Sequence, residues 1–177
     1  MKNILICGVA KSGKSYLANK LCKKYNYNHI PIDYFTSSFK HNFPELGITS
    51  NVVIDKDSSK KLSLFLSRVI NIIDSCDNEK YILDSAHLYP EDIIKYIDLN
   101  KWNVYFTGYP NTNINNKFNE IRNYVHNGWP ENKSDEELKN IISKLIDISK
   151  DIEKQCHMYD IEFIDTSDFN NINNYFL

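Results

Sequence analysis

The chain has 177 residues, of which 42% are hydrophobic and 25% charged. That length is enough for one domain with a buried core, and we expect residues 1–177 to form a single domain. The net charge of −2 provides no general attraction for polyanions, which argues against nucleic acid as a partner.

Cysteine usage and apolar runs predict a location. The four cysteines include no C-x-x-C pair, so they indicate neither a zinc site nor a redox motif, and we interpret them as buried free thiols in a reducing cytoplasm. The apolar run at residues 4–7 is too short for a signal peptide, and no segment approaches the roughly 20 apolar residues of a membrane span. We therefore expect a cytoplasmic protein with no membrane partner.

Strands alternate with helices along the first half of the chain. Residues 4–7 predict a buried strand that ends at Gly8, and a helix is expected over about 14–25. Residues 29–32 predict a second strand ending at Asp33, and Pro31 assigns it to a sheet edge because proline has no backbone donor. Residues 34–58 show no clear period and are interpreted as a long, functional loop.

The second half continues the alternation. We expect a helix over about 59–74, a strand over 81–83, a short helix over about 90–96 and a strand over 102–106. Residues 111–133 are polar, with a helix near 116–124, and a capping box at 134–137 begins a long helix. A last strand is expected at 161–164. This order predicts an α/β fold with a parallel sheet and helices on both faces, in which ligands bind at the carboxyl ends of the strands.

One motif decides the class of protein. Residues 8–15 read GVAKSGKS and match G-x-x-x-x-G-K-[ST] at every fixed position, between a predicted strand and a predicted helix. In such a loop backbone N–H groups point inward around phosphate oxygens, Lys14 reaches the β- and γ-phosphates, and the Ser15 hydroxyl binds Mg²⁺. We therefore expect a purine nucleoside triphosphate and Mg²⁺ as ligands, with ATP as the predicted nucleotide and GTP as the alternative. The residues expected to contact the nucleotide here are Gly8, Val9, Ala10, Lys11, Ser12, Gly13, Lys14, Ser15 and Tyr16.

The motif and the element order resemble the P-loop NTPases, and the short chain resembles their small kinases, such as nucleoside, nucleotide, shikimate and uridine kinases. This resemblance implies a three-layer sandwich with a five-stranded parallel sheet in the order 2-3-1-4-5. It also implies an acceptor-site region at about 34–58 and a lid at about 109–133. A GTPase fits less well, because residues 84–87, DSAH, contain no D-x-x-G, and residues 100–103, NKWN, precede a strand instead of following one.

Two aspartates at strand ends are the catalytic and metal candidates. Residues 32–35, IDYF, are similar to the strand-end segment of uridine-kinase-like enzymes, which implies that Asp33 orients the acceptor hydroxyl and takes its proton. Asp84 stands in the Walker B position, where a carboxylate holds Mg²⁺ directly or through water. For both residues the alternative is an aspartate that caps a turn.

The predicted lid contains few cations. The chain has two arginines, Arg68 and Arg122, and Arg122 is the candidate that clamps the transferring phosphoryl group. Lys117 is interpreted as part of a solvated helix face. Lids of the adenylate-kinase type use several arginines, so the lack of them here favours a neutral hydroxyl acceptor over a nucleoside monophosphate.

Other candidates are less specific. Thr166 lies in a segment, 165–167, that resembles the loop near the adenine ring in small kinases, so backbone contacts to the base are expected there. His87 lies near the predicted cleft and is interpreted as a solvated loop histidine, with contact to the substrate as the alternative, and Trp129 has no assigned role. Four aromatic residues form either a stacking wall for a ring or ordinary packing: Tyr34, Phe35, Phe39 and Phe43.

The sequence thus predicts an ATP-dependent kinase that transfers the γ-phosphoryl group to a hydroxyl of a nucleoside-like or other small-molecule acceptor. The alternative is a nucleotide-binding regulatory or assembly ATPase without such an acceptor, marked by a large exposed apolar patch opposite the P-loop. A kinase acting on a nucleic-acid end is disfavoured by the net charge of −2. The long C-terminal helix would support a homodimer.

Overall fold

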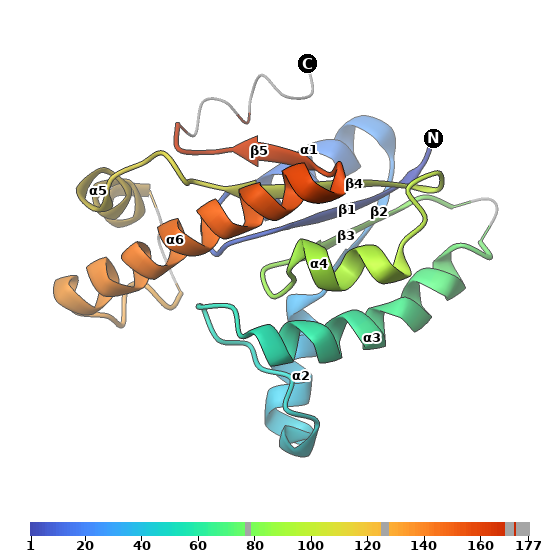
Figure 1. Ribbon diagram of the computed structural model, residues 1–177, viewed down its shortest axis with the longest axis horizontal. Helices are drawn as coiled ribbons and strands as arrows, with labels where there is room; N and C mark the ends of the chain where they lie inside the picture. The colour runs from blue at the N-terminus through green and yellow to red at the C-terminus, as the bar shows by residue number, and fades with distance from the viewer. Residues whose placement is uncertain (77–78, 125–127, 169–171, 173–177) are drawn as a thin grey trace.

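The computed structural model describes residues 1–76, 79–124, 128–168 and 172 (Figure 1). Its five strands form one parallel sheet in the order β2-β3-β1-β4-β5, which confirms the predicted fold class and strand order. The strands are β1 (Asn3–Gly8), β2 (Asn28–Pro31), β3 (Tyr81–Ser85), β4 (Trp102–Gly108) and β5 (Glu162–Asp165). The edge position that Pro31 predicted for the second strand is also confirmed.

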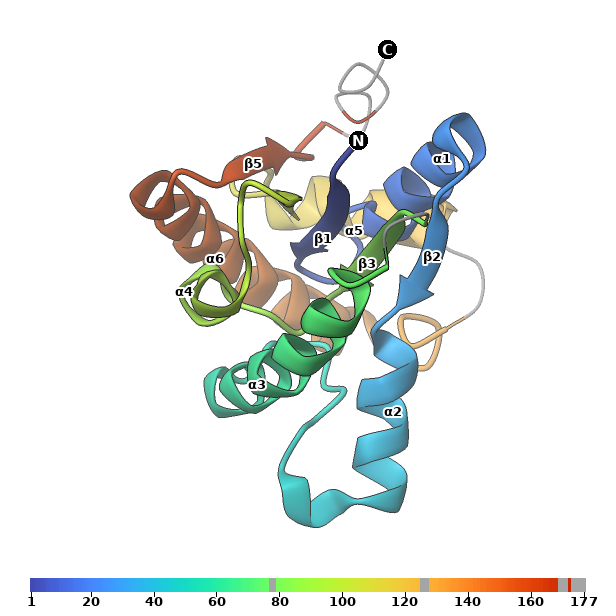
Figure 2. The same ribbon diagram turned by 90° about the vertical axis from the view of Figure 1, so that its right-hand side faces the viewer.

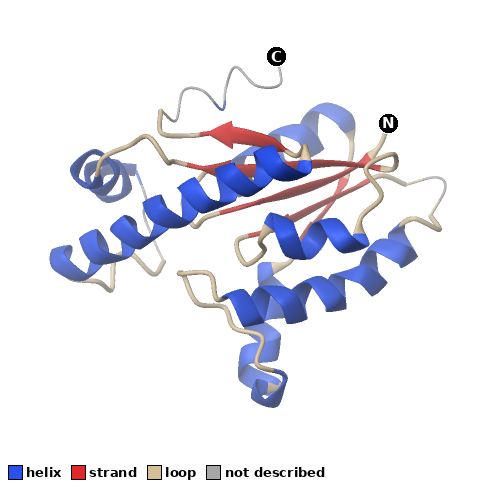
Figure 3. Ribbon diagram, viewed as in Figure 1, coloured by secondary structure: helices blue, strands red, loops and turns tan. Residues whose placement is uncertain are grey.

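Helices connect the strands, and strand and helix alternate along the chain (Figure 3). They are α1 (Lys14–Tyr25), α2 (Asp33–Asn42), η1 (Pro44–Leu46), α3 (Lys56–Ile73), α4 (Pro90–Ile93), η2 (Ile94–Tyr96), α5 (Ile114–Tyr124) and α6 (Asp135–Tyr159). The predicted capping box is present, since the Ser134 hydroxyl accepts from Glu137 N and the Glu137 carboxylate accepts from Ser134 N. Helix α3 begins three residues before the predicted start, because the Asp55 carboxylate accepts from Ser58 N at 2.7 Å and caps it.

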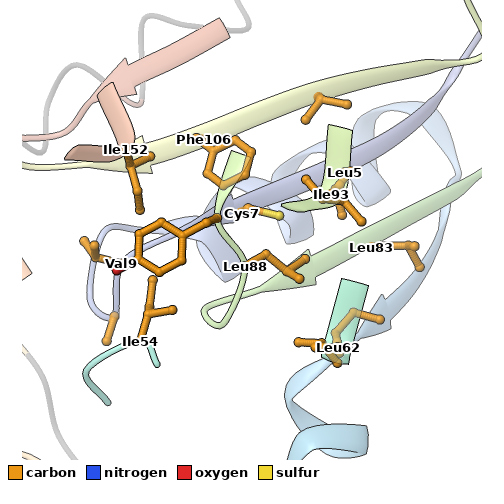
Figure 4. Packing of buried hydrophobic residues seen from close by; sticks show 14 of the residues in the cluster. Leu5, Cys7, Val9, Ile54, Leu62, Leu83, Leu88, Ile93, Phe106 and Ile152 are labelled. Carbon is orange, nitrogen blue, oxygen red and sulfur yellow. The ribbon is translucent and has the colours of Figure 1, made fainter. Parts of the chain in front are cut away.

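The core lies on both faces of the sheet because successive side chains of β1 point in opposite directions. Leu5 and Cys7 belong to the larger cluster, which α3, α4 and α6 cover (Figure 4). Ile4 and Ile6 belong to a second cluster, which α1 covers with three apolar residues, Leu17, Ala18 and Leu21. Figure 1 shows α3, α4 and α6 together on one side of the sheet and α1 on the other.

The segment 34–58 differs from its prediction as a loop. About half of it is helical, as α2 and η1, and Figure 2 shows α2 extending away from the sheet. Thr36 is the only buried residue of α2, so this helix has no apolar stripe and its sequence carries no helical period. Because periodicity reports burial of one face, a helix that buries almost nothing was missed.

Two further observations concern the cysteines and the membrane. All four cysteines are free, but only Cys7 and Cys156 are buried, whereas Cys22 and Cys76 are partly exposed. Among the described residues, no helix combines the length and apolar character needed to cross a membrane.

Candidate nucleotide and acceptor site

The P-loop connects β1 to α1 and has an unusual backbone. Gly8, Lys11 and Gly13 have φ angles of +134°, +60° and +85°, and such left-handed residues turn neighbouring N–H groups into one concave surface that suits an anion. The positive φ of Lys11 is costly for a residue with a Cβ, and such strain is typical of functional loops. The backbone therefore fits the phosphate-binding role that the motif predicts.

Strand β4 supports the loop from beneath. Val9 N donates to Thr107 O at 3.2 Å, and the Ser12 and Thr107 hydroxyls are hydrogen-bonded at 2.5 Å. Thr107 is so close to Gly8 that a Cβ on the glycine would lie 1.9 Å from its carbonyl oxygen. Gly8 is thus required both by its φ angle and by the approach of the neighbouring strand.

Lys14 is buried beneath the loop. Its Nζ donates to Val9 O at 2.7 Å, and the residue is only 6% exposed. Burial lowers the pKa of the Lys14 ammonium, whereas the nearby carboxylates of Asp33 and Asp84 raise it. A phosphate in the loop would bring this cation the counter-charge that burial demands.

The first turn of α1 offers further groups for an anion. Gly13 caps this helix without a side-chain hydrogen bond, and no acidic residue lies in its first turn. Ser15 and Tyr16 are exposed there. A helix N-terminus of this kind presents unpaired N–H groups and a positive dipole end.

Asp84 lies at the end of β3, beside the P-loop strand. It pairs in register with Ile6 of β1, it is 2% exposed, and its Oδ2 contacts His29 Nε2 at 2.8 Å. Hydroxyl and carboxylate oxygens such as those of Ser15 and Asp84 suit Mg²⁺. Across the described part of the chain no three acidic, histidine or cysteine side chains gather around a metal, so Mg²⁺ here would also need phosphate oxygens as ligands.

Asp33 lines a pocket together with residues of the P-loop. The pocket has a volume of about 370 Å³, and its lining includes Lys14, Ser15, Asp33, Ala86 and Trp129. The Asp33 side chain is 49% exposed, and its Oδ1 accepts weakly from Ala86 N at 3.4 Å. The structure therefore brings the predicted base and the phosphate-binding residues to one cavity.

His87 stands behind this carboxylate and is buried, so its interpretation as a solvated histidine is wrong. Its Nε2 lies 3.6 Å from Asp33 Oδ1. Burial lowers the pKa of His87, an effect that Asp33 opposes and Lys14 reinforces. A neutral imidazole beside Asp33 leaves the carboxylate without a permanent counter-ion on that side.

Tyr109 ties the predicted lid to the P-loop, a connection that the sequence analysis missed. The residue follows β4 directly, and its buried hydroxyl donates to Ala10 O at 3.0 Å. The Lys117 ammonium lies 4.3 Å from the centre of the Tyr109 ring and donates to Glu120 at 2.7 Å. Lys117 is fully buried, so its interpretation as part of a solvated face is wrong.

Arg122 binds within the lid region. Its guanidinium donates to Pro130 O at 3.0 Å, to Lys133 O at 2.8 Å and to Asp135 Oδ1 at 2.8 Å. These bonds fix the turn that follows residue 128, and they direct the guanidinium to that turn in this conformation. Its role as a phosphoryl clamp stays a prediction, and residues 125–127 of the predicted lid lie outside the described residues.

Thr166 is buried at the end of β5. Its N–H and its hydroxyl both donate to Gly108 O, at 2.7 and 3.0 Å. The side chain thus joins β4 to β5, and contact of the neighbouring backbone with a base stays a prediction.

The aromatic residues of the predicted acceptor region divide into two groups. Phe35 and Phe39 contact Phe65 of α3, with ring centres 5.7 and 4.9 Å apart. Tyr34 and Phe43 are 72% and 51% exposed. Packing against α3 therefore accounts for Phe35 and Phe39, whereas Tyr34 and Phe43 face solvent.

Comparisons with known proteins agree with this fold. No family model matches the chain, and no curated protein matches its sequence. A shikimate kinase from Bacteroides thetaiotaomicron is similar in structure, with a TM-score of 0.61 and 15% identity over 98% of this chain and 93% of that chain. A shikimate kinase from Acinetobacter baumannii, in complex with shikimate, has a TM-score of 0.60 and 13% identity over 98% and 88%. A gluconokinase from Sinorhizobium meliloti has a TM-score of 0.55 and 12% identity over 98% and 92%. At these identities the similarity concerns the fold, and the chain has the fold of the P-loop small kinases.

Proposed function

We propose that this protein is an ATP-dependent kinase that transfers the γ-phosphoryl group of Mg-ATP to a hydroxyl group of a small molecule. The observation that carries the proposal is that P-loop residues and Asp33 line one and the same pocket of about 370 Å³. Phosphoryl transfer needs a hydroxyl held in line with the γ-phosphate, and a carboxylate opposite a phosphate cradle does this. The fold shared with shikimate kinases and a gluconokinase supports a small-molecule kinase in general.

Each residue has a proposed role in this reaction. The backbone of residues 8–15 and the Lys14 ammonium hold the phosphates and stabilise the charge that develops on the transferring group. Asp33 orients the acceptor hydroxyl and accepts its proton. Mg²⁺, when bound to the phosphates with Ser15 and Asp84, would neutralise phosphate charge. His29 contacts Asp84 at 2.8 Å and would orient its carboxylate for that task.

The test is ATP turnover with Mg²⁺, measured alone and with a panel of nucleosides, sugars and other small alcohols. The proposal expects that at least one acceptor raises ADP release well above the basal rate. In Asp33→Asn that stimulation should fall by roughly a hundredfold or more, the range of general base catalysis, while ATP affinity changes little. Asp147→Asn is the matched control, because Asp147 is an exposed carboxylate on α6 paired with Lys150. Full stimulated turnover in Asp33→Asn would remove the assigned base.

A nucleotide-binding regulatory or assembly ATPase is the second candidate. Its supporting observation is the pair of exposed aromatic residues, Tyr34 and Phe43, on the segment that extends away from the sheet (Figure 2). A contiguous exposed apolar patch is typical of a protein contact, and these two residues would be part of such a patch. Tight ATP binding with a slow basal rate that no acceptor changes would favour this candidate over the kinase.

A further inference from the structure

Trp129 forms part of the pocket that the P-loop and Asp33 share, although no sequence motif marks it. It lines the cavity together with Ala86 and Tyr16, and it is half-buried. The Lys11 ammonium lies 6.0 Å from the centre of its ring. The indole is therefore part of the wall of the pocket that the phosphate-binding loop and the predicted base also line.

The turn that carries Trp129 is well fixed. Glu131 N donates to Gly128 O at 3.2 Å, and Lys133 N donates to Pro130 O at 3.3 Å. The Arg122 guanidinium then binds the carbonyls of Pro130 and Lys133. The indole itself packs against the edge of the main core. A rigid ring held in this way binds a flat ligand without a large loss of side-chain entropy.

The charges around the pocket disfavour an anionic acceptor. Among the described residues that line it, the only basic ones are Lys11 and Lys14, and both belong to the phosphate-binding loop. Arg122 does not line the pocket but binds the turn that carries Trp129. Arg68 is exposed on α3, about 18 Å along the helix from its first residue, Lys56. A carboxylate or phosphate on the acceptor would meet the Asp33 carboxylate with no guanidinium to pair with.

We propose that Trp129 determines acceptor specificity and that the acceptor is an uncharged, hydroxylated ring compound, either a nucleoside or a sugar. One face of the ring stacks on the indole while a hydroxyl of the same molecule binds Asp33. This inference rests on the proposed kinase function and adds the class of acceptor and the residue that selects it.

The first experiment compares acceptors in pairs, a carboxylate and its methyl ester, so that the ring and its hydroxyl groups stay the same while the charge changes. Turnover of Mg-ATP is measured with orotidine methyl ester and orotidine, with methyl D-glucuronate and D-glucuronate, and with methyl shikimate and shikimate. We expect the uncharged member of the preferred pair to have a kcat/KM at least roughly tenfold higher, because the two lysines among the described lining residues belong to the phosphate-binding loop and no guanidinium is left to pair with the anion. The pair with the higher kcat/KM shows whether the acceptor ring belongs to a nucleoside or to a sugar.

The second experiment changes the ring. Base–aromatic stacking has an effect of about tenfold or more when the aromatic residue is removed, so Trp129→Ala should raise the acceptor KM by about tenfold and leave the KM for ATP nearly unchanged. Trp129→Phe keeps a ring and should recover most of the acceptor affinity. Far-UV circular dichroism and the thermal midpoint show whether either variant is folded.

Tryptophan fluorescence provides a readout without turnover. Acceptor added to the ADP complex should change the emission of the wild-type protein but not of Trp129→Phe. Trp102 should stay silent, because it is buried and its indole N–H donates to Asp74 at 2.8 Å. A preference for the anionic member of every pair, or an unchanged acceptor KM in Trp129→Ala, would overturn the inference and leave the kinase intact. Absence of stimulation by every acceptor would overturn the kinase proposal, and the inference with it.

Discussion

Replacing Gly8 by alanine tests the contact between the P-loop and β4. The new Cβ would lie 1.9 Å from Thr107 O and 2.7 Å from Thr107 N, so either β1 and β4 separate or the loop moves. Overpacking of this kind costs about 1–3 kcal/mol. The φ of +134° adds a conformational cost of about 1–3 kcal/mol for a residue with a side chain. We therefore expect Gly8→Ala to lower the free energy of unfolding by about 2–6 kcal/mol.

Gly128→Ala is the matched control. Gly128 also has a positive φ, +116°, but the nearest atom to its added Cβ is Pro130 Cδ at 3.9 Å, an ordinary contact. This variant should therefore show the conformational cost alone. The assay is urea unfolding of both variants and the wild type, analysed by linear extrapolation. If Gly8→Ala is not at least about 1 kcal/mol more destabilising than Gly128→Ala, the close approach of β4 does not constrain this position.

Three further predictions concern buried polar groups near the site. Tyr109→Phe removes the donor to Ala10 O, which should lower the free energy of unfolding by about 1–3 kcal/mol and weaken ATP binding, both measurable by urea titration and calorimetry. Glu120→Gln should be more destabilising than Lys117→Met in the same urea assay. The first variant leaves the fully buried Lys117 ammonium without a counter-charge, a loss of about 3–5 kcal/mol, whereas the second leaves Glu120, which is 29% exposed and can be solvated. Equal losses in the two variants would contradict this prediction. Burial lowers the pKa of His87 below 6.5, so the unfolded chain binds more protons than the folded one. The free energy of unfolding is therefore highest above about pH 6.5 and decreases as the pH falls towards the pKa of His87 in the folded protein. In His87→Gln the free energy of unfolding should depend less on pH between about pH 5 and 7.5.

The sequence predicted those parts of the fold that local rules determine. The P-loop motif needs glycine at positions with left-handed backbone, and the structure has Gly8 and Gly13 there. The capping box at Ser134 and the edge position of Pro31 depend on which donors a residue has, and both are confirmed. Alternating strands and helices predicted a parallel sheet with helices on both faces, whereas the strand order was implied by the resemblance to the small P-loop kinases.

What the sequence did not predict depends on contacts between distant segments. From the sequence, Lys117 looks like a polar surface residue, because nothing in its position in a helix indicates burial. In the structure it is buried and contacts the Tyr109 ring and the Glu120 carboxylate. His87 is likewise buried, and its imidazole lies near Asp33, a residue distant in the sequence. Trp129 stands in a polar stretch without a periodic pattern, and only the turn that Arg122 holds brings it to the pocket. A tryptophan in a polar segment was the one available signal.

The edge strand β2 also affects how this protein associates with other chains. Asn28 N donates to the carbonyl of Lys80, just before β3, and Ile32 N donates to Asp84 O of β3. By the alternation of a strand, the residues whose backbone faces the open edge are therefore His29 and Pro31. Pro31 has no N–H, which leaves His29 as the only backbone donor of this strand on that side. Another strand that docked here would find too few partners to extend the sheet, so this edge resists both intermolecular sheet growth and aggregation. Two copies of the chain would have to associate through other surfaces.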